Sequence, residues 1–283
     1  MHKILVPTDL SSYSMKAFEY SLEMAAEHGG TVMMLNVYFL ADVNARAPVI
    51  KEMLNAIEAI QERTDLTVIT AEEDDSWPEE KSNEKGRKVY CELLVRQGFV
   101  EEEIINTAVQ KEADLIMMGT HGASGLGYWL FGSSTAEVIE KSEHPVLAVP
   151  PEADFNKIEK VVYATDLTTE KDPALAQLIR FVRYWKAELQ MIHVRNPEEA
   201  PNTDQLQYLA EDISEHHNLD DILFFEVENK SIINGILEHI KEQNPDIIAM
   251  TTQYRGFLQK IMDSSKTSKM ALEGKVPVLA FHR

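Results

Sequence analysis

One pattern of short apolar segments occurs twice in this chain, and it constrains the fold more than any other feature of the sequence. Four segments return in the same order: 4–11 (ILVPTDLS) as 161–168 (VVYATDLT), 35–38 (LNVY) as 192–195 (IHVR), 112–120 (EADLIMMGT) as 244–252 (NPDIIAMTT), and 144–149 (HPVLAV) as 276–281 (VPVLAF). The last two pairs share one constant offset, with 112 matching 244 and 144 matching 276, so the C-terminal third of each half aligns without a gap. Four ordered matches indicate two copies of one domain.

Within each copy, strand-like runs alternate with helix-like stretches. In the first half the patterns predict strands at 3–6, 31–37, 89–95, 114–118 and 145–149, and helices at 11–27, 48–63, 100–112 and 135–141. Strands that alternate with helices form parallel sheets whose two faces are covered by the helices. We therefore predict an α/β fold in both halves.

The boundary between the halves is expected in a short proline-containing segment, PPEADFN at 150–156. This gives two domains, residues 1–151 and 157–283. A chain of 283 residues that is 44% apolar is long and hydrophobic enough for two separate cores. The first half also carries a polar segment at 72–87 (EEDDSWPEEKSNEKGR), which we expect to be a solvated loop.

The charge balance excludes several classes of partner. Acidic residues number 47 against 27 basic ones, for a net charge of −20, so a nucleic-acid backbone or an anionic membrane surface would be repelled. With a single cysteine, Cys91, the chain can form neither an internal disulfide nor a thiolate zinc cluster. The first residues contain too short an apolar run for a signal peptide, and no stretch of about 18 apolar residues occurs. We expect a cytoplasmic protein that binds neither nucleic acid nor membranes.

A glycine-rich segment, GTHGASGLGYWLFGSS at 119–134, lies between a strand-like run and a helix. Gly119 and Gly122 can adopt positive φ and carry no Cβ, which lets a ligand approach the backbone closely. Gly132 precedes Ser133, Ser134 and Thr135 at a helix start, where free N–H groups, hydroxyls and the helix dipole attract an anion. The same residues are also good helix caps, so a phosphate site and a simple turn both stay open. The segment is not a Walker A loop, and no GxGxxG follows the first strand.

Three places in the first half are expected at the carboxyl ends of parallel strands, where such sheets bind ligands. They are Pro7-Thr8-Asp9, Val37 and the glycine-rich segment. The Asp9 carboxylate could accept a hydrogen bond from an adenine amino group or a ribose hydroxyl. It could equally cap the helix at 11–27.

These residues resemble the universal stress protein family. Gly119-x-x-Gly122, nine further residues and Gly132-Ser133 match the G-2x-G-9x-G-(S/T) signature of its ATP-binding members. The segments ILVPTDLSS, LNV, ADLIMMGTHG and HPVLAV are also similar to that family. The resemblance covers both halves, so the chain is identified as a tandem universal stress protein. It implies two Rossmann-like domains of the adenine nucleotide alpha hydrolase-like type, each with a five-stranded parallel sheet and helices on both faces.

The resemblance implies an ATP site in the first half, with Mg²⁺ as a companion of the phosphates. Asp9 and the backbone of Val37 would contact adenine, and the last glycine with its hydroxyl neighbours would hold the phosphates. The full set of implied binding residues is Pro7, Thr8, Asp9, Val37, Met118, Gly119, Gly122, Gly132, Ser133, Ser134 and Thr135. The resemblance also implies that the halves pair through their final strands, 145–149 and 277–281, as a pseudo-dimer. A homodimer of two chains is a further expectation.

The second half departs from the signature. At the constant offset of the repeat, Gly119, Gly122 and Gly132 become Thr251, Tyr254 and Ser264, whereas Ser133 is retained as Ser265. The aspartate after the first strand is retained as Asp166. Because three glycines are lost and a tyrosine would fill the phosphate region, we predict that the second half binds no ATP. It then either completes the pseudo-dimer, presents a partner surface, or binds another small molecule.

No strong catalytic constellation is present in the sequence. No arginine finger is placed near the glycine-rich segment and no HExxH motif suggests a dedicated metal site. His121 could touch a phosphate or be an ordinary loop residue. We therefore predict a nucleotide-dependent stress-response sensor or regulator that acts through an unidentified protein partner. The alternatives are a weak ATPase that can phosphorylate itself on a loop serine, and a nucleotide-free module that binds another small molecule in the second half.

Overall fold

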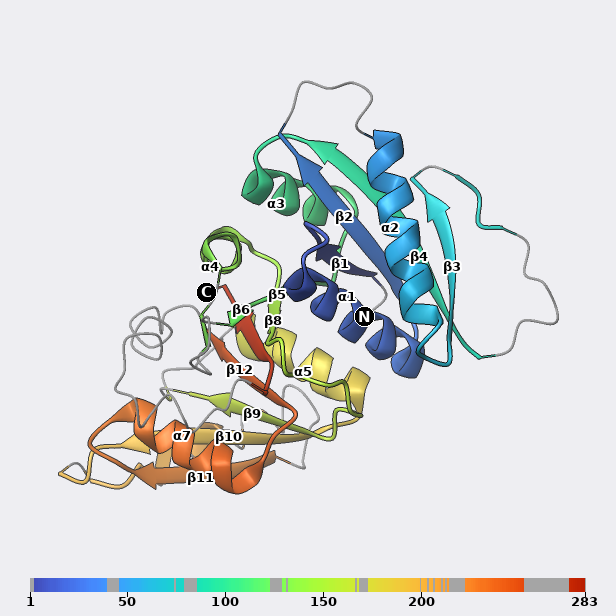
Figure 1. Cartoon of the computed structure of the whole chain (residues 1–283). Helices are drawn as coiled ribbons and strands as arrows, with labels where there is room; N and C mark the ends of the chain where they lie inside the picture. Colours follow the sequence, from blue (N-terminus) through green and yellow to red (C-terminus); the bar gives the residue numbers. More distant parts are fainter. Residues whose placement is uncertain are drawn as a thin grey trace. The chain divides into compact units, whose positions relative to one another are not determined.

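The computed structural model describes most of the chain, in the ranges 3–39, 46–73, 75–78, 86–122, 129–130, 132–165, 167, 173–198, 200–202, 204–205, 207–209, 211, 213, 222–251 and 275–282. The chain divides into two compact units, residues 1–121 with 131–155 and residues 122–130 with 156–283. Each unit is an α/β structure built on a parallel sheet, as the sequence predicts (Figure 1).

The sheet of the first unit has β1 near its centre (Figure 1). In the spatial order β8-β5-β1-β2-β4-β3, every described strand runs parallel to its neighbours. The strands are β1 (Lys3–Pro7), β2 (Thr31–Tyr38), β3 (Leu66–Glu72), β4 (Arg87–Gln97), β5 (Leu115–Gly119) and β8 (Val146–Val149). Ile4, Leu5 and Val6 of β1 are buried, as expected for a strand covered on both faces. The described part of this unit therefore has six strands in its sheet where the sequence predicts five.

The additional strand is β3, at the edge of the sheet. It pairs with β4 in the register Leu66↔Arg87 to Glu72↔Leu93, and only part of it is buried. A short, half-buried edge strand beside a highly charged segment gives a weak hydrophobic signal. The charged segment itself is not wholly solvated, because the Trp77 ring packs edge-on against Tyr90, with 5.1 Å between the ring centroids.

Four helices in the described part of the first unit cover the sheet. They are α1 (Ser12–His28), α2 (Arg46–Gln61), α3 (Val100–Gln110) and α4 (Ser133–Lys141). From β1 the chain moves through α1 and α2 toward the β3 edge of the sheet. From β4 it moves back through α3 and α4 toward the β8 edge. Right-handed crossovers therefore place the two pairs on opposite faces. No helix in the described ranges is long and apolar enough to cross a bilayer.

Part of the glycine-rich segment is ordered as a second, two-stranded sheet. It consists of β6 (His121–Gly122) and β7 (Trp129–Leu130). The sequence predicts a loop throughout this stretch. Residues 123–128 and 131, which complete the segment, lie outside the described residues.

The second unit repeats the plan of the first with five described strands, the number predicted. Their order is β11-β10-β9-β12-β13, and all neighbours are parallel. The strands are β9 (Lys160–Ala164), β10 (Glu188–Arg195), β11 (Ile222–Glu228), β12 (Ile247–Thr251) and β13 (Val278–Phe281), and the helices are α5 (Pro173–Trp185) and α7 (Ile232–Gln243). The second unit therefore places corresponding strands in corresponding positions of its own sheet.

The repeat extends from the hydrophobic pattern to individual contacts. In each unit the first lysine of the first strand donates its N–H to an aspartate, at 3.1 Å from Lys3 to Asp114 and 2.9 Å from Lys160 to Asp246. Left-handed backbone recurs at matching positions, with φ of 62° at both Leu10 and Leu167, 54° at Glu112 and 46° at Asn244. The corners between strands and helices are thus copied together with the core.

Candidate functional site

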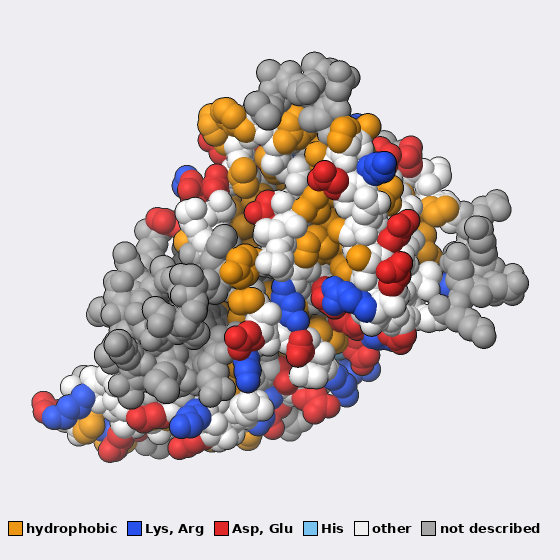
Figure 2. Space-filling view, viewed as in Figure 1, with side chains coloured by type: hydrophobic (Ala, Val, Ile, Leu, Met, Phe, Trp, Pro, Cys, Tyr) orange, Lys and Arg blue, Asp and Glu red, His pale blue; other side chains and the backbone are white. Residues whose placement is uncertain are grey.

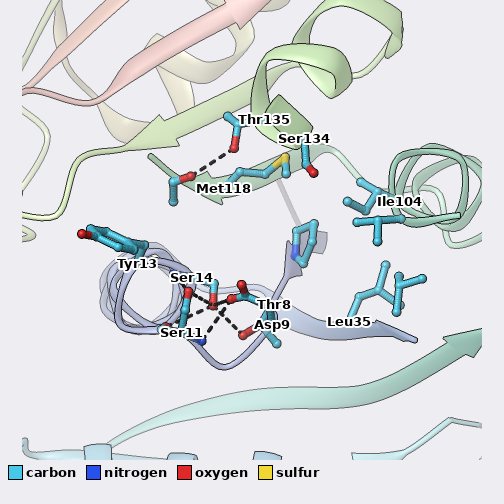
Figure 3. Close-up of a pocket in the computed structure, with 14 residues that line it drawn as sticks. Thr8, Asp9, Ser11, Tyr13, Ser14, Leu35, Ile104, Met118, Ser134 and Thr135 are labelled. Atoms are coloured by element: carbon cyan, nitrogen blue, oxygen red, sulfur yellow. Dashed lines mark hydrogen bonds between the residues drawn. The ribbon is translucent and has the colours of Figure 1, made fainter. Parts of the chain in front are cut away.

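A pocket of about 150 Å³ opens at the carboxyl ends of β1, β2 and β5 in the first unit (Figure 3). The chain leaves β1 toward β2 on one side and returns to β5 on the other, so the pocket lies where the strand order reverses. The residues that line it are Pro7, Thr8, Asp9, Ser11, Tyr13, Ser14, Leu35, Val37, Val100, Ile104, Met118, Gly119, Ser134 and Thr135. Eight of the eleven residues predicted from the sequence therefore lie around one cavity.

The other three predicted residues lie elsewhere along the glycine-rich segment. Gly132 is the N-cap of α4, with φ −57° and ψ 156°, and Ser133 is the first residue of that helix. Gly122 is the second residue of β6 and the first of the residues grouped with the second unit. The sequence left open whether Ser133 only caps its helix. Gly132 holds the cap position instead and supplies no side-chain hydrogen bond to the first N–H groups of α4.

One wall of the pocket is apolar. It is formed by Leu35 and Val37 of β2, Met118 of β5, and Val100 and Ile104 of α3. Such a surface with a few polar groups at its margin suits a flat heteroaromatic base. Sequence reasoning missed Leu35, Val100 and Ile104. The available signal was the four-residue spacing of Val100 and Ile104, which puts both side chains on one face of α3.

Asp9 lines the pocket from the turn after β1, where it lies beside Ser11 and Ser14 (Figure 3). Its Oδ1 accepts hydrogen bonds from Ser11 N at 3.0 Å and Ser14 Oγ at 2.7 Å. Partial burial raises the pKa of the Asp9 carboxyl, but the bonds from Ser11 and Ser14 outweigh burial and leave this pKa below its usual value. The N-cap of α1 is Ser11, not Asp9. Both of these bonds go to Oδ1, so Oδ2 is the carboxylate oxygen that a ligand would reach.

The turn that carries Asp9 is held rigidly. Leu10 adopts φ 62°, which is uncommon for a residue other than glycine, and its N–H donates to Thr8 Oγ1 at 2.9 Å. Asn36 Nδ2 donates to the Thr8 carbonyl oxygen at 2.8 Å. These contacts fix the position of the aspartate before any ligand arrives.

Gly119 lines the pocket and also has a packing role that the sequence did not reveal. The sequence suggests positive φ and room for a ligand, but Gly119 is not among the described glycines with positive φ. A Cβ at this position would overlap the carbonyl group of Tyr13, lying 2.6 Å from its carbon atom. The missing side chain therefore makes room for the first turn of α1. Thr135 Oγ1 donates to the Gly119 carbonyl oxygen at 3.1 Å and ties α4 to the same strand end (Figure 3).

The start of α4 carries a carboxylate contact that the sequence did not reveal. Ser134, which lines the pocket, donates its hydroxyl to Glu101 Oε1 of α3 at 2.5 Å. This hydrogen bond lowers the pKa of the Glu101 carboxyl, which is ionised at neutral pH. None of the lining residues is a lysine or an arginine, and no group of three potential metal ligands occurs among the described residues.

The outer margin of the pocket on the α3 side is hydrophobic. Phe39 and Phe99 are both well exposed, and their ring centroids are 5.5 Å apart. Val100, which follows Phe99, lines the pocket and is also exposed. Figure 2 shows hydrophobic side chains at the surface of the first unit around α3 and the end of β2. The apolar wall of the pocket thus continues onto the protein surface.

The corresponding positions of the second unit differ in their chemistry. Thr251 replaces Gly119 and is buried. Tyr38, at the end of β2, is replaced by Arg195, a buried side chain paired with Glu226 at 3.2 Å and with Glu228. Asp166, Tyr254, Ser264 and Ser265 lie outside the described residues.

Comparisons with known proteins agree on one family. Residues 1–150 and 157–282 each match the model of the Universal stress protein family. Universal stress protein MJ0531 of Methanocaldococcus jannaschii is 33% identical over 147 residues, which are 52% of this chain and 81% of that protein. Universal stress protein YxiE of Bacillus subtilis is 30% identical over 153 residues, or 52% of this chain and 98% of that protein. The crystal structure of a universal stress protein from Archaeoglobus fulgidus has the same fold, with a TM-score of 0.69 and 21% identity over 99% of this chain and 98% of that one.

Proposed function

The chain belongs to the universal stress protein family, with one family domain in each half, and we propose from this premise that the first half binds ATP and signals its bound state to a protein partner. The observation that carries the proposal is the convergence of Pro7-Thr8-Asp9, Val37, Met118-Gly119 and Ser134-Thr135 on one pocket. These residues come from three strand ends and one helix start, far apart in the sequence. Their meeting at the reversal of strand order is the arrangement that α/β proteins use to bind nucleotides.

In the proposed complex the adenine ring lies against Leu35, Val37 and Ile104 of the apolar wall. Asp9 Oδ2 accepts a hydrogen bond from the adenine amino group or from a ribose hydroxyl. The pocket volume of about 150 Å³ is below the roughly 300–1,000 Å³ of most small-molecule sites. Part of the nucleotide must therefore extend outside the pocket, and we place its phosphates at the start of α4, where the N–H groups lack a side-chain cap.

A second candidate function is phosphorylation of the protein by its own ATP. The observation that favours it is the Ser134 hydroxyl, which already donates to the Glu101 carboxylate at 2.5 Å. If Ser134 Oγ attacked the γ-phosphorus, ADP would leave and Glu101 would take the hydroxyl proton. Because no basic side chain is among the residues that line the pocket, none of them would give charge in such a transition state a cationic partner, and we expect this reaction to be slow. Phosphate on Ser134, found by mass spectrometry after incubation with ATP and Mg²⁺, would favour this candidate over binding alone.

The test of nucleotide binding uses the purified full chain. Denaturation should release an adenine nucleotide that chromatography identifies, and a chain stripped of it should bind added ATP. The variant Gly132→Val should abolish both results, because its isopropyl group would occupy space beside the first N–H groups of α4. The backbone at Gly132, with φ −57° and ψ 156°, is one that valine adopts readily, so the fold should survive.

Gly132→Ala is the graded control, since it adds one methyl group at the same backbone position and should weaken binding less. Thermal unfolding of both variants checks that neither has lost its structure. Nucleotide retained at the wild-type level by Gly132→Val would count against this site. A nucleotide-free chain that carries another small molecule would instead favour a binding role for the second half. The protein partner, the cytoplasmic location and the pairing of the two halves or of two chains stay predictions.

A further inference from the structure

The Ser134 hydroxyl has one acceptor in the structure, Glu101, and a second in the proposed complex, a phosphate oxygen. It lines the pocket at the start of α4, where the proposed function places the phosphates, and it donates to Glu101 Oε1 at 2.5 Å. A serine hydroxyl carries a single hydrogen and can therefore donate to only one acceptor at a time. A phosphate oxygen that used Ser134 as a donor would have to displace Glu101 from it.

The charges around this hydroxyl make the competition unfavourable for a bare phosphate tail. Glu101 begins a run of three acidic residues in the first turn of α3, and the pocket itself contains Asp9 but no lysine or arginine. Lys141 of α4 is the basic residue that acts on Glu101, but its Nζ is paired with Glu137 at 2.5 Å and does not line the pocket. A triphosphate would add several negative charges beside an ionised carboxylate, with only neutral donors from the pocket in return.

On the premise that this site binds ATP, as proposed above, we infer that Glu101 makes it selective for the charge of the ligand's phosphate tail, so that free ATP is disfavoured and ATP accompanied by a divalent cation is preferred. A divalent cation on the phosphates cancels two of their negative charges and so weakens the repulsion from Glu101 and Asp9. Glu101 acts here as a specificity residue, and its hydrogen bond to Ser134 sets where its charge lies.

The second half of the chain differs at the corresponding position. At the constant offset of the repeat Glu101 becomes Ile233, so the carboxylate is present only in the half that carries the glycine signature. A bond that served only to join α3 to α4 would have no dependence on the ligand's charge. Charge selectivity can therefore be told apart from a purely structural role by varying the charge of the ligand as well as the protein.

The experiment compares wild type, Glu101→Gln and Glu102→Gln, each stripped of nucleotide. Glutamine at 101 keeps the side-chain shape and an oxygen that can accept from Ser134, but it removes the charge. Glu102 is an exposed neighbour, so Glu102→Gln removes an equal charge one residue away and is the matched control. Calorimetric titrations use three probes: ATP with EDTA, ATP with Mg²⁺, and uncharged adenosine.

We expect Glu101→Gln to bind cation-free ATP about tenfold more tightly than wild type, a change of ~1.4 kcal/mol. Adenosine should bind the two proteins equally, and the ratio of affinities for ATP with and without Mg²⁺ should fall in Glu101→Gln. Glu102→Gln should change cation-free ATP binding by less than about threefold, because an exposed charge is screened by salt.

Three other outcomes would contradict either the charge selectivity of Glu101 or the proposed binding of ATP. Equal effects of Glu101→Gln and Glu102→Gln would overturn the charge selectivity of Glu101 while leaving ATP binding intact. Weaker adenosine binding in Glu101→Gln would show that the carboxylate contacts the nucleoside instead, which also overturns the inference. If wild type bound none of the three probes, the proposed function would fail and this inference with it.

Discussion

At the scale of single residues, Gly119 has a role in packing the fold that is separate from its proposed role in the ATP site. Its missing side chain lets β5 end against the Tyr13 carbonyl group at the start of α1. We expect Gly119→Ala to lower the free energy of unfolding by roughly 1–3 kcal/mol, because either the strand end or the helix must move to admit the methyl group. Urea denaturation followed by circular dichroism measures the loss.

Gly98→Ala is the matched control for this substitution. A Cβ at Gly98 would approach Glu103 Cγ and Oε1 at 2.7 Å, and these atoms belong to a flexible side chain that can turn away. We expect a change of less than about 1 kcal/mol, since alanine also restricts the unfolded chain. Equal losses in the two variants would contradict the role of close backbone packing at Gly119.

The residues of the candidate site differ in how far the sequence could predict them. Asp9 and Val37 follow or end strands that the hydrophobic pattern identifies, and parallel strands bring their carboxyl ends to one edge. Glu101 could not be found in this way, because its bond to Ser134 joins residues 33 positions apart on two helices. Such a contact depends on how α3 and α4 pack, and no local pattern encodes that.

At the scale of elements, the strands that are buried on both faces were predictable and the edge strand was not. β1, β2, β5 and β8 appear within one or two residues of their expected bounds because their apolar runs are continuous. β3 borders the sheet, is only partly buried, and adjoins the charged segment that precedes β4. Its place is decided by pairing with β4, a long-range contact that a window of sequence does not contain.

Helix α7 carries a buried histidine that should make stability depend on pH. His239 packs against Phe225 of β11, with 4.6 Å between ring centroids, and its Nε2 has no hydrogen-bond partner among the described residues. Burial lowers the pKa of His239 in the folded state, so the unfolded chain takes up the proton first as pH falls below about 6.5. The stabilisation that comes from keeping His239 neutral is therefore fully present above about pH 6.5. It is lost as the pH falls toward the lowered pKa of His239 in the folded state.

We expect the urea midpoint of wild type to decrease between pH 7.5 and pH 5.5, and to decrease less in His239→Leu, which cannot be protonated. The control is Thr107→Val, at the corresponding position of the first half, where a buried hydroxyl oxygen also lacks a described partner but does not titrate. This variant should keep the wild-type pH dependence. If the urea midpoint of His239→Leu decreased with pH as steeply as that of wild type, groups other than His239 would be responsible for the loss of stability at low pH.

At the scale of the whole molecule, the two halves share a framework and differ in what lies at the strand ends. The aspartate contacts at Lys3 and Lys160, and the left-handed turns at Leu10 and Leu167, recur with little change. Where the first half has Gly119, the second has a buried threonine, and the charged Glu101 becomes an isoleucine. The two halves therefore share the corners of the fold and differ in the residues that we propose to bind a nucleotide.

This asymmetry predicts one bound nucleotide per chain. Equilibrium dialysis of the stripped protein against ATP and Mg²⁺ should saturate at one equivalent, because the glycines of the signature are replaced in the second half by Thr251, Tyr254 and Ser264. Gly132→Val should bring the stoichiometry to zero. Ser264→Val, the matched change at the corresponding position of the second half, should leave it at one. Saturation at two equivalents, or loss of binding in Ser264→Val alone, would mean that the second half holds a nucleotide site of its own, built without the glycines.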